Sequence, residues 1–251
     1  MAFSGEVAWV TGSSTGIGRA VAEGLAREGC RVAVHYNSSQ DEAREVVNGI
    51  EGSGGEAMLV GGDVSDGGEV RRMADEIEDR FGRLDILVNN AGSLLERRSL
   101  EEMTEDLWDR VMDVNLKSVY LCSQAVLPVM KRQGRGRIVN ITSVAARNGG
   151  GPGSVAYATA KGGVSTLTRA MAKELVADNI LVNGVAPGVI TTPFHDRFTP
   201  PDVREKMAGA IPIGREGTPE ETAGAVVFLA SSAADYLVGE IIEVNGGQLM
   251  D

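Results

Sequence analysis

Short apolar runs alternate with amphipathic stretches from one end of the chain to the other. The runs have the length and composition of buried strands, and they fall at residues 7–10, 31–36, 57–60, 84–88, 138–142, 180–183 and 241–244. Between them, apolar side chains recur at helical spacing, which predicts helices near residues 17–28, 43–50, 70–81, 105–132, 160–175, 202–209 and 220–231. Strands that are apolar throughout are covered on both faces. The order therefore predicts a doubly wound, mostly parallel seven-stranded α/β sheet with helices on both faces.

Nothing in the pattern separates a second folding unit. No linker, repeat or low-complexity segment interrupts it, and the glycine clusters at 52–55 and 149–153 are short enough to be turns. We therefore expect residues 1–251 to form a single domain. Sheets of this kind bind ligands at the carboxyl ends of their strands, so the loops after the strands are the places to look for chemistry.

Composition narrows the class of protein. The chain has 33 glycines, two cysteines and a net charge of −11. Two cysteines exclude a disulfide scaffold, and the acidic balance disfavours nucleic acids and anionic membranes as partners. No apolar run reaches the roughly 18 residues of a spanning helix, and two histidines without a ligand-spaced cluster give no support to a metal site. The first residues lack the basic region of a secretory signal, and Cys30 and Cys122 have apolar neighbours, so we expect a cytoplasmic protein with reduced thiols.

A glycine-rich loop follows the first predicted strand and opens the first predicted helix. Its glycines are Gly12, Gly16 and Gly18. The first allows a tight turn, the second lets the backbone approach a pyrophosphate, and the third permits close packing of the helix. The free N–H groups of the helix N-terminus then face the anion. The loop predicts a dinucleotide site.

The end of the second strand bears on the type of dinucleotide. Sites that prefer NAD place Asp or Glu there to accept hydrogen bonds from the ribose 2′-hydroxyl. This strand ends in His35-Tyr36-Asn37-Ser38, and the first acid is Asp41. No carboxylate would repel a 2′-phosphate, so NADP(H) is favoured, with Ser14, Asn37 and Ser38 as phosphate donors. No Arg or Lys lies in this loop, however, so NAD(H) remains the alternative. We interpret His35 as a packed strand residue.

A tyrosine and a lysine lie four residues apart on the helix after the fifth strand. Tyr157 and Lys161 therefore share one face of that helix. An ammonium group beside a phenol favours the phenolate, which lowers the tyrosine pKa toward a range suited to acid–base catalysis. Ser143 lies just after the fifth strand, at the edge of the sheet where ligands bind. Either feature alone is common, but both occur here with the glycine loop.

Six motifs occur in order along the chain. They are TGSSTGIG at 11–18, Asn89-Asn90-Ala91-Gly92, Asn115, Ser143, Tyr157-Ala158-Thr159-Ala160-Lys161, and Pro187-Gly188. Over essentially its whole length the sequence resembles the short-chain dehydrogenase/reductase family. The resemblance implies a Rossmann fold. It also implies an NAD(P)-dependent oxidoreductase that transfers a hydride between a nicotinamide cofactor and a carbonyl or secondary alcohol.

The resemblance also assigns roles to residues. Tyr157 would be the general acid in reduction and the base in oxidation, Ser143 would hydrogen-bond the substrate oxygen, Lys161 would bind the nicotinamide ribose and lower the tyrosine pKa, and Asn115 would anchor a water in a proton relay. The implied cofactor-binding residues are Gly12, Ser14, Thr15, Gly16, Ile17, Gly18, Tyr36, Asn37, Ser38, Asp63, Val64, Asn89, Ala91, Gly92, Tyr157, Lys161, Pro187, Gly188, Val189 and Thr191.

The sequence says less about which residues bind the substrate. The resemblance implies a mobile lid at about residues 190–215, and Arg147, His195 and Arg197 lie near the expected mouth. They are either solvated loop residues or a pocket for a carboxylated carbonyl substrate, since arginine binds carboxylates bidentately. Two subgroups look similar. One is the 3-oxoacyl-[acyl carrier protein] reductases, and the other is the sugar or uronate dehydrogenases. The Pro-Phe-His segment and the Gly-Gly-Pro-Gly loop favour the second subgroup.

Two further expectations concern docking and assembly. Scattered basic residues could form a docking patch for an acidic acyl carrier, or they could simply be solvated: Arg97, Arg98, Lys131, Arg132, Arg135 and Arg137. The resemblance also implies a homotetramer. A catalytically silent nucleotide-binding regulator on the same scaffold is the alternative from a different class, and it would be expected to lack one of the three reactive residues.

Overall fold

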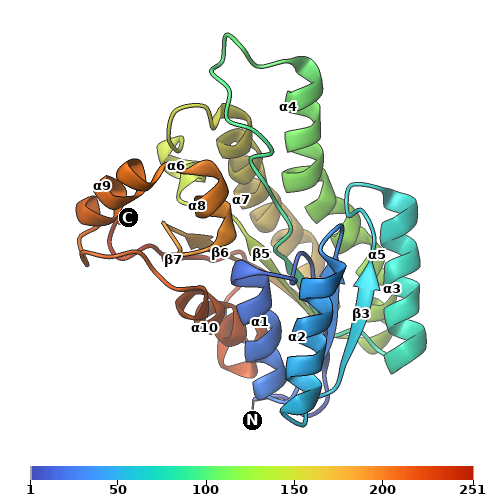
Figure 1. Cartoon of the computed structure of the whole chain (residues 1–251). Coiled ribbons are helices and arrows are strands. Elements are labelled where there is room, and N and C mark those ends of the chain that lie inside the picture. Colours follow the sequence, from blue (N-terminus) through green and yellow to red (C-terminus); the bar gives the residue numbers. More distant parts are fainter. Residues whose placement is uncertain (1, 251) are drawn as a thin grey trace.

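The computed structural model describes residues 2–250 and contains one parallel sheet between two layers of helices (Figure 1). The strands are β1 (Val7–Val10), β2 (Arg31–Tyr36), β3 (Ala57–Gly61), β4 (Ile86–Asn89), β5 (Gly136–Ile141), β6 (Ile180–Pro187) and β7 (Ile241–Val244). Their order across the sheet is β3-β2-β1-β4-β5-β6-β7, and every neighbouring pair is parallel. The predicted doubly wound, seven-stranded single domain is confirmed.

The helices divide between the two faces of the sheet. They are α1 (Gly16–Arg27), α2 (Gln40–Gly52), α3 (Gly67–Phe81), α4 (Glu105–Met112), α5 (Ser118–Gln133), α6 (Ala145–Asn148), α7 (Val155–Leu175), α8 (Pro193–Phe198), α9 (Pro201–Ala210) and α10 (Pro219–Ala230). Side chains of α1, α2 and α10 pack on one face, and those of α3, α5 and α7 pack on the other. Both faces of the central strands are therefore dry, as their unbroken apolar sequences require.

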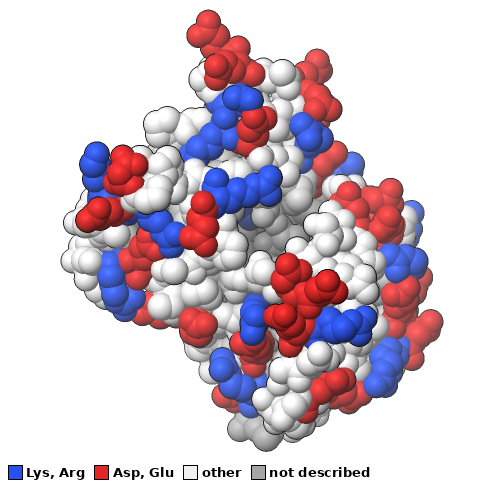
Figure 2. Space-filling view, in the orientation of Figure 1, with Lys and Arg blue, Asp and Glu red and all other residues white. Residues whose placement is uncertain are grey.

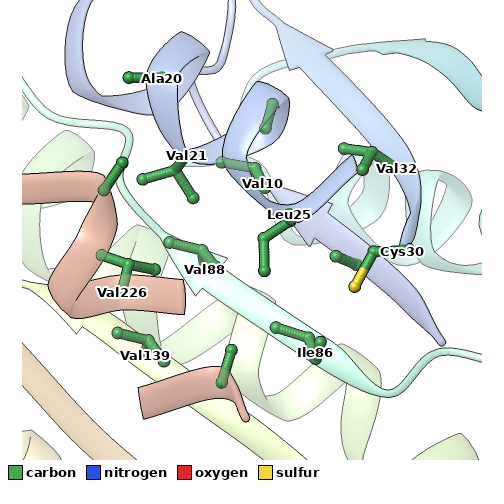
Figure 3. Close-up of a cluster of buried hydrophobic side chains, with 14 of the residues drawn as sticks. Val10, Ala20, Val21, Leu25, Cys30, Val32, Ile86, Val88, Val139 and Val226 are labelled. Carbon is green, nitrogen blue, oxygen red and sulfur yellow. The ribbon is translucent and has the colours of Figure 1, made fainter. Parts of the chain in front are cut away.

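Figure 3 shows the first of these two cores. Val10, Val32 and Val88 project from adjacent strands toward Val21 of α1 and Val226 of α10. All five side chains are fully buried. This packing holds the amino end of α1 against the carboxyl ends of β1 and β4, where the strand order reverses. Ligand sites in such sheets form at this switch point.

The long helix predicted over 105–132 is interrupted. Residues Asp113–Lys117 form a π-helical turn between α4 and α5. A π turn inserts one extra residue, which rotates the following side chains around the axis. Asn115 is thereby fully buried, and its Nδ2 atom donates to the carbonyl of Val111. The predicted ends agree with the start of α4 at Glu105 and the end of α5 at Gln133, but apolar periodicity alone does not register such a local insertion.

Two helices outside the layers cover the carboxyl edge near β6 and β7. They are α8 and α9, which fall within the predicted lid segment, and only the second was expected from the sequence. Prolines at the start of each supply the fixed φ that suits a first helical turn. No helix within residues 2–250 is both long enough and apolar enough to cross a membrane.

Candidate active site

A cavity of about 850 Å³ opens along the carboxyl edge of the sheet. It runs from the loop after β3, past the glycine loop, to the lid helices, and Figure 2 shows the hollow at the centre of the molecule. Of the cofactor residues implied by the sequence, all but Asn89 and Thr191 line it. Ser143, Tyr157, Lys161 and His195 line it as well.

The glycine loop has the backbone shape that a dinucleotide phosphate requires. Gly12 and Gly16 have φ values of +61° and +56°, a region that favours glycine. A Cβ atom on Gly18 would lie 2.3 Å from the Gly12 carbonyl oxygen, so only glycine fits there. The first turn of α1 contains no acid, and its N-cap residue Thr15 makes no side-chain capping bond. The amino end of α1 thus keeps free N–H groups for an anion.

His35 supports this loop from beneath. Its Nδ1 atom accepts a hydrogen bond from the Gly12 N–H at 2.8 Å, and its Nε2 atom lies 2.9 Å from the Gly62 carbonyl oxygen. A carbonyl oxygen only accepts, so the imidazole is neutral with its proton on Nε2. Burial lowers its pKa to about 4. His35 is therefore a packed strand residue, as expected, and it also positions the loop.

The end of β4 contributes Asn90 rather than Asn89. Asn89 is buried under the sheet, where its Nδ2 atom donates to Ser123 and Asn140. Asn90 lines the cavity, and its Nδ2 atom donates to the carbonyl oxygens of Thr11 and Gly12, each at 2.9 Å. Successive strand residues point to opposite faces, so the placement of Asn89 in the cavity wall was displaced by one residue.

Tyr157, Ser143 and Lys161 meet at one wall of the cavity. The Tyr157 and Ser143 hydroxyls are hydrogen-bonded, and the Lys161 Nζ atom lies 5.7 Å from the centre of the tyrosine ring. Nζ also donates to the Ile141 carbonyl at 2.8 Å, which holds the lysine against the end of β5.

Burial dominates the acid–base properties of this group. It raises the pKa of Tyr157 to about 12, although the hydrogen bond from Ser143 acts in the opposite direction. It lowers the pKa of Lys161 to about 8. The sequence led us to expect the lysine to lower the tyrosine pKa. In the structure desolvation of the phenolate raises that pKa instead, and the cause that opposes it is the hydrogen bond from Ser143.

Asn115 lies behind the lysine rather than in the cavity wall. Its side chain bonds both backbone groups of Ser93, accepting from the N–H at 3.1 Å and donating to the carbonyl at 2.7 Å. A Cβ atom on Gly92 would lie 2.6 Å from the Asn115 Oδ1 atom and 3.3 Å from the Lys161 Nζ atom. Glycine at this position thus lets the amide and the ammonium group approach one another.

The end of the cavity that the sequence assigns to the nicotinamide is formed by the loop after β6 and the C-terminal turn. Thr192 lines the cavity, whereas the Thr191 hydroxyl points away and donates to Glu216 at 2.9 Å. The Oε1 atom of Gln248 is buried beside Gly188 and has no hydrogen-bond partner within residues 2–250. An acceptor without a donor here suits an amide N–H of a bound ligand. Gln248 was missed because the sequence offers no motif around it.

Arg97, rather than Arg147 or Arg197, lines the cavity at the end nearest α8. Arg147 is exposed and pairs with Glu243, and Arg197 is exposed over the Phe198 ring. Arg97 lines the cavity, where its Nε and Nη1 atoms donate to the carbonyls of Phe198 and Pro152. Arg97 lies far in the sequence from Phe198 and Pro152, so residue spacing could not identify it.

Comparison with known proteins agrees with this geometry. A family model described as enoyl-(acyl carrier protein) reductase matches residues 12–248. A 3-oxoacyl-[acyl-carrier-protein] reductase from Staphylococcus epidermidis is 43% identical over 243 residues, which cover 97% of this chain and 98% of the relative. The chain belongs to the short-chain dehydrogenase/reductase family. It is an NAD(P)-dependent oxidoreductase of that family.

Solved structures of short-chain dehydrogenase/reductase proteins superpose over nearly the whole chain. One, from Beutenbergia cavernae, is provisionally described as an NAD(P)-dependent gluconate 5-dehydrogenase with NADP bound at low occupancy. It has a TM-score of 0.92 and 38% identity, and covers 98% of this chain and 97% of its own. Another, from Agrobacterium tumefaciens, is provisionally described as a gluconate dehydrogenase. It has a TM-score of 0.93 and 35% identity, and covers 99% of this chain and 97% of its own.

Proposed function

We propose that this oxidoreductase is an NADP(H)-preferring carbonyl reductase in which Tyr157 is the general acid. The observation that carries the proposal is the meeting of Tyr157, Ser143 and Lys161 on the wall of the cavity that also receives the glycine loop. A tyrosine with a pKa near 12 holds its proton at neutral pH. The group that must donate a proton to the substrate oxygen in reduction is therefore protonated in the resting site.

The surrounding residues divide the remaining work. When bound, the nicotinamide cofactor supplies the hydride. The Ser143 hydroxyl orients the substrate oxygen toward the tyrosine. Lys161 binds the nicotinamide ribose and supports the tyrosine electrostatically. Asn115, through its bonds to Ser93, holds the loop behind the lysine and anchors the proton relay. The lid of α8 and α9 excludes water from the reacting atoms.

The preference for NADP(H) rests on the end of β2. Tyr36, Asn37 and Ser38 line the cavity there, and none carries a negative charge. The hydroxyls of Ser14 and Ser38 and the amide of Asn37 can donate to a 2′-phosphate, and α2 begins two residues later with its N–H groups toward the same loop. The Beutenbergia relative is described with NADP bound, which supports the same preference.

Two substrate classes follow from the relatives. The 3-oxoacyl-[acyl-carrier-protein] reductases act on a carrier-bound acyl group, whereas the structural neighbours are described as gluconate dehydrogenases. The residues suggested for an acyl-carrier patch are engaged in part, since Arg132 pairs with Glu78 and Arg137 pairs with Asp235. A small-molecule carbonyl substrate is therefore the better supported of the two.

A homotetramer in the cytoplasm completes the proposal. Strand β7 is an edge of the sheet, and exposed apolar side chains lie near it on Phe228, Tyr236 and Val238. Such an edge and patch are suited to pairing between copies of the chain. The two buried, unpaired thiols agree with a reducing compartment. Light scattering on the eluted protein tests the assembly.

The direct test of the reaction is Tyr157→Phe. Loss of the acid is expected to lower kcat by about 10²- to 10⁴-fold, whereas the Kd for NADPH, measured by fluorescence titration, stays close to that of the wild type. Tyr120→Phe, which removes an exposed hydroxyl from α5, is the matched control. A Tyr157→Phe protein that reduces a carbonyl panel as well as the wild type would overturn the assignment. A wild type that binds NADPH and reduces no carbonyl would favour a silent regulator.

A further inference from the structure

Arg97 lies at the substrate end of the cavity without a carboxylate partner. Its Nε atom donates to the Phe198 carbonyl of α8 at 2.7 Å, and its Nη1 atom donates to the Pro152 carbonyl at 2.9 Å. Both acceptors are neutral. Within residues 2–250 no Asp or Glu side chain pairs with this guanidinium, and its Nη2 atom has no acceptor. Burial lowers the Arg97 pKa, which shows that the charge is partly removed from water.

The charge of the cavity differs from that of the whole chain. The chain carries a net charge of −11, yet Asp63 is the one carboxylate among the described residues that line the cavity. Asp63 follows β3, at the opposite edge of the sheet from the lid, where its Oδ1 atom accepts from Ser65. The substrate end thus contains Arg97 and Lys161 and no acid. Figure 2 shows blue side chains on the rim of the central hollow.

The neighbouring acids of the lid do not neutralise Arg97. Asp196 and Glu216 lie close to His195, but both carboxylates are held by Arg204. Glu96 pairs with Arg98. These three acids are therefore already paired, whereas no carboxylate among the described residues pairs with the guanidinium in the cavity wall. A partly buried cation in this condition is stabilised by an anion that comes from outside the protein.

Two aromatic rings of α8 line the cavity on the side of Tyr157 and Arg97. The Phe194 ring lies 5.7 Å from the Tyr157 ring and 5.2 Å from the Phe198 ring, measured between centres. The Phe198 backbone carbonyl in turn accepts from Arg97. A substrate whose oxygen lies at Tyr157 and whose anionic group lies at Arg97 would run along this apolar wall. The two groups are then several carbons apart.

We propose that Arg97 binds the carboxylate of the substrate, and that the enzyme prefers keto or hydroxy acids whose reacting carbon is several bonds from that carboxylate. This inference rests on the proposed reductase function and adds its substrate class. Through its hydrogen bonds to Phe198 and Pro152, Arg97 also links the lid to the loop of residues 149–153. Anion binding and closure of the lid are therefore coupled. The residue binds substrate and takes no part in the proton transfer.

The test compares a keto acid with its uncharged methyl ester. The substrates are 5-oxohexanoate and its methyl ester, which share the carbonyl and the chain, and the proteins are wild type, Arg97→Gln and Arg97→Lys. Wild type should reduce the acid with the higher kcat/KM. Arg97→Gln should lower kcat/KM for the acid by about 10- to 100-fold, the range for one hydrogen-bonded charge pair, and leave the ester within about threefold of wild type. Arg97→Lys should retain part of the preference for the acid, because lysine keeps the positive charge but cannot form the two parallel hydrogen bonds of a guanidinium.

Arg98→Gln is the matched control, since it removes the same charge from an exposed side chain that pairs with Glu96. Calorimetric titration of 5-oxohexanoate into the enzyme–NADPH complex gives a readout that does not need turnover. Equal losses for acid and ester in Arg97→Gln would mean that the residue only clips the loops, and would overturn the proposal. So would a wild type that does not bind the acid. Reduction of other carbonyls that depends on Tyr157 would leave the proposed function standing in either case.

Discussion

The imidazole of His35 accepts the backbone N–H of Gly12 at 2.8 Å, so a histidine of β2 holds the first turn of the glycine loop on β1. The same residue is tied to Ser13, whose Oγ atom accepts the His35 N–H at 2.9 Å. The ring is almost completely buried. The conformation of the phosphate loop therefore depends on a side chain that must remain neutral.

This dependence predicts a loss of stability in mild acid. The pKa of His35 falls from its ordinary value of 6.5 to about 4 in the folded chain. Between these values the unfolded chain binds a proton that the folded chain does not, so the free energy of unfolding decreases as the pH falls through this window. The group should cost about 2 kcal/mol at pH 5 relative to pH 7. Urea unfolding at the two pH values measures it.

His35→Asn provides the comparison, because an amide oxygen can accept the Gly12 N–H and does not titrate. We expect this variant to lose less stability than wild type between pH 7 and pH 5, since the carboxylates common to both proteins cancel in the difference. Parallel curves for the two proteins would show that His35 does not titrate in this range.

Gly92 makes a second prediction because of what surrounds it. A methyl group there would lie 2.6 Å from the Asn115 Oδ1 atom and 3.3 Å from the Lys161 Nζ atom, so one of these groups must move. A displacement of about 1 Å in an active site can cost about 10²-fold in rate. We expect Gly92→Ala to lower kcat by about this factor while the circular dichroism spectrum is unchanged.

Gly49→Ala is the control for the loss of a glycine. Gly49 lies within α2, and a Cβ atom there would meet nothing within 4 Å. Because alanine is the better helix former, this change should leave kcat unaltered and stabilise the protein by up to about 1 kcal/mol. Wild-type kcat in Gly92→Ala would show that the close approach is not needed for turnover.

The sequence was sufficient for the sheet because local and global signals agree there. The strand cores are mainly apolar and every crossover is helical, which leaves few alternatives to a parallel, doubly wound sheet. The glycine loop was equally readable, since strand, turn and helix follow one another without insertion. Within this frame Tyr157 and Lys161 share a helix face, so their proximity follows from four-residue spacing alone.

The features of the site that the sequence did not predict depend on single-residue shifts and on long-range contacts. A shift of one residue decides whether Asn89 or Asn90 lines the cavity at the end of β4. The same holds for Thr191 and Thr192 after β6. The π turn that buries Asn115 lies inside an unbroken helical pattern. Arg97 contacts Pro152 and Phe198 only because two loops and the end of α8 converge. Helical and strand periodicity carry no information about such convergence.

The carboxylate of Glu216 should help to hold the lid in place. Glu216 accepts from the Nε and Nη2 atoms of Arg204 at 2.6 and 2.7 Å, and from the Thr191 hydroxyl. Arg204 lies on α9, so this contact ties the lid helix to the loop after β6. The pKa of Glu216 is lowered chiefly by Arg204, and the carboxylate is ionised at neutral pH. Glu216→Gln removes that charge and weakens a bidentate pair.

We expect Glu216→Gln to accelerate proteolysis within residues 193–210 and to raise KM by several-fold with a smaller effect on kcat. Arg215→Gln is the control, because Arg215 pairs with Glu221 at an exposed site where ion pairs contribute little. Cleavage of the lid at the wild-type rate in Glu216→Gln would mean that apolar packing, and not this carboxylate, holds the two helices in place.

The preference for NADP(H) can be tested by adding one charge without changing shape. Asn37 lines the cavity at the end of β2, where NAD-preferring sites of this fold carry an acid. Asn37→Asp should raise the Kd for NADPH by about 10- to 100-fold, the effect of a like charge near a phosphate at 1.4 to 2.7 kcal/mol, and change the Kd for NADH little or lower it. Fluorescence titration of both cofactors gives the ratio. Asn48→Asp, an exposed site on α2, adds the same charge away from the cavity and should alter neither Kd. If Asn37→Asp and Asn48→Asp leave the ratio equally unchanged, the 2′-phosphate lies elsewhere and the uncharged end of β2 does not determine the choice of cofactor.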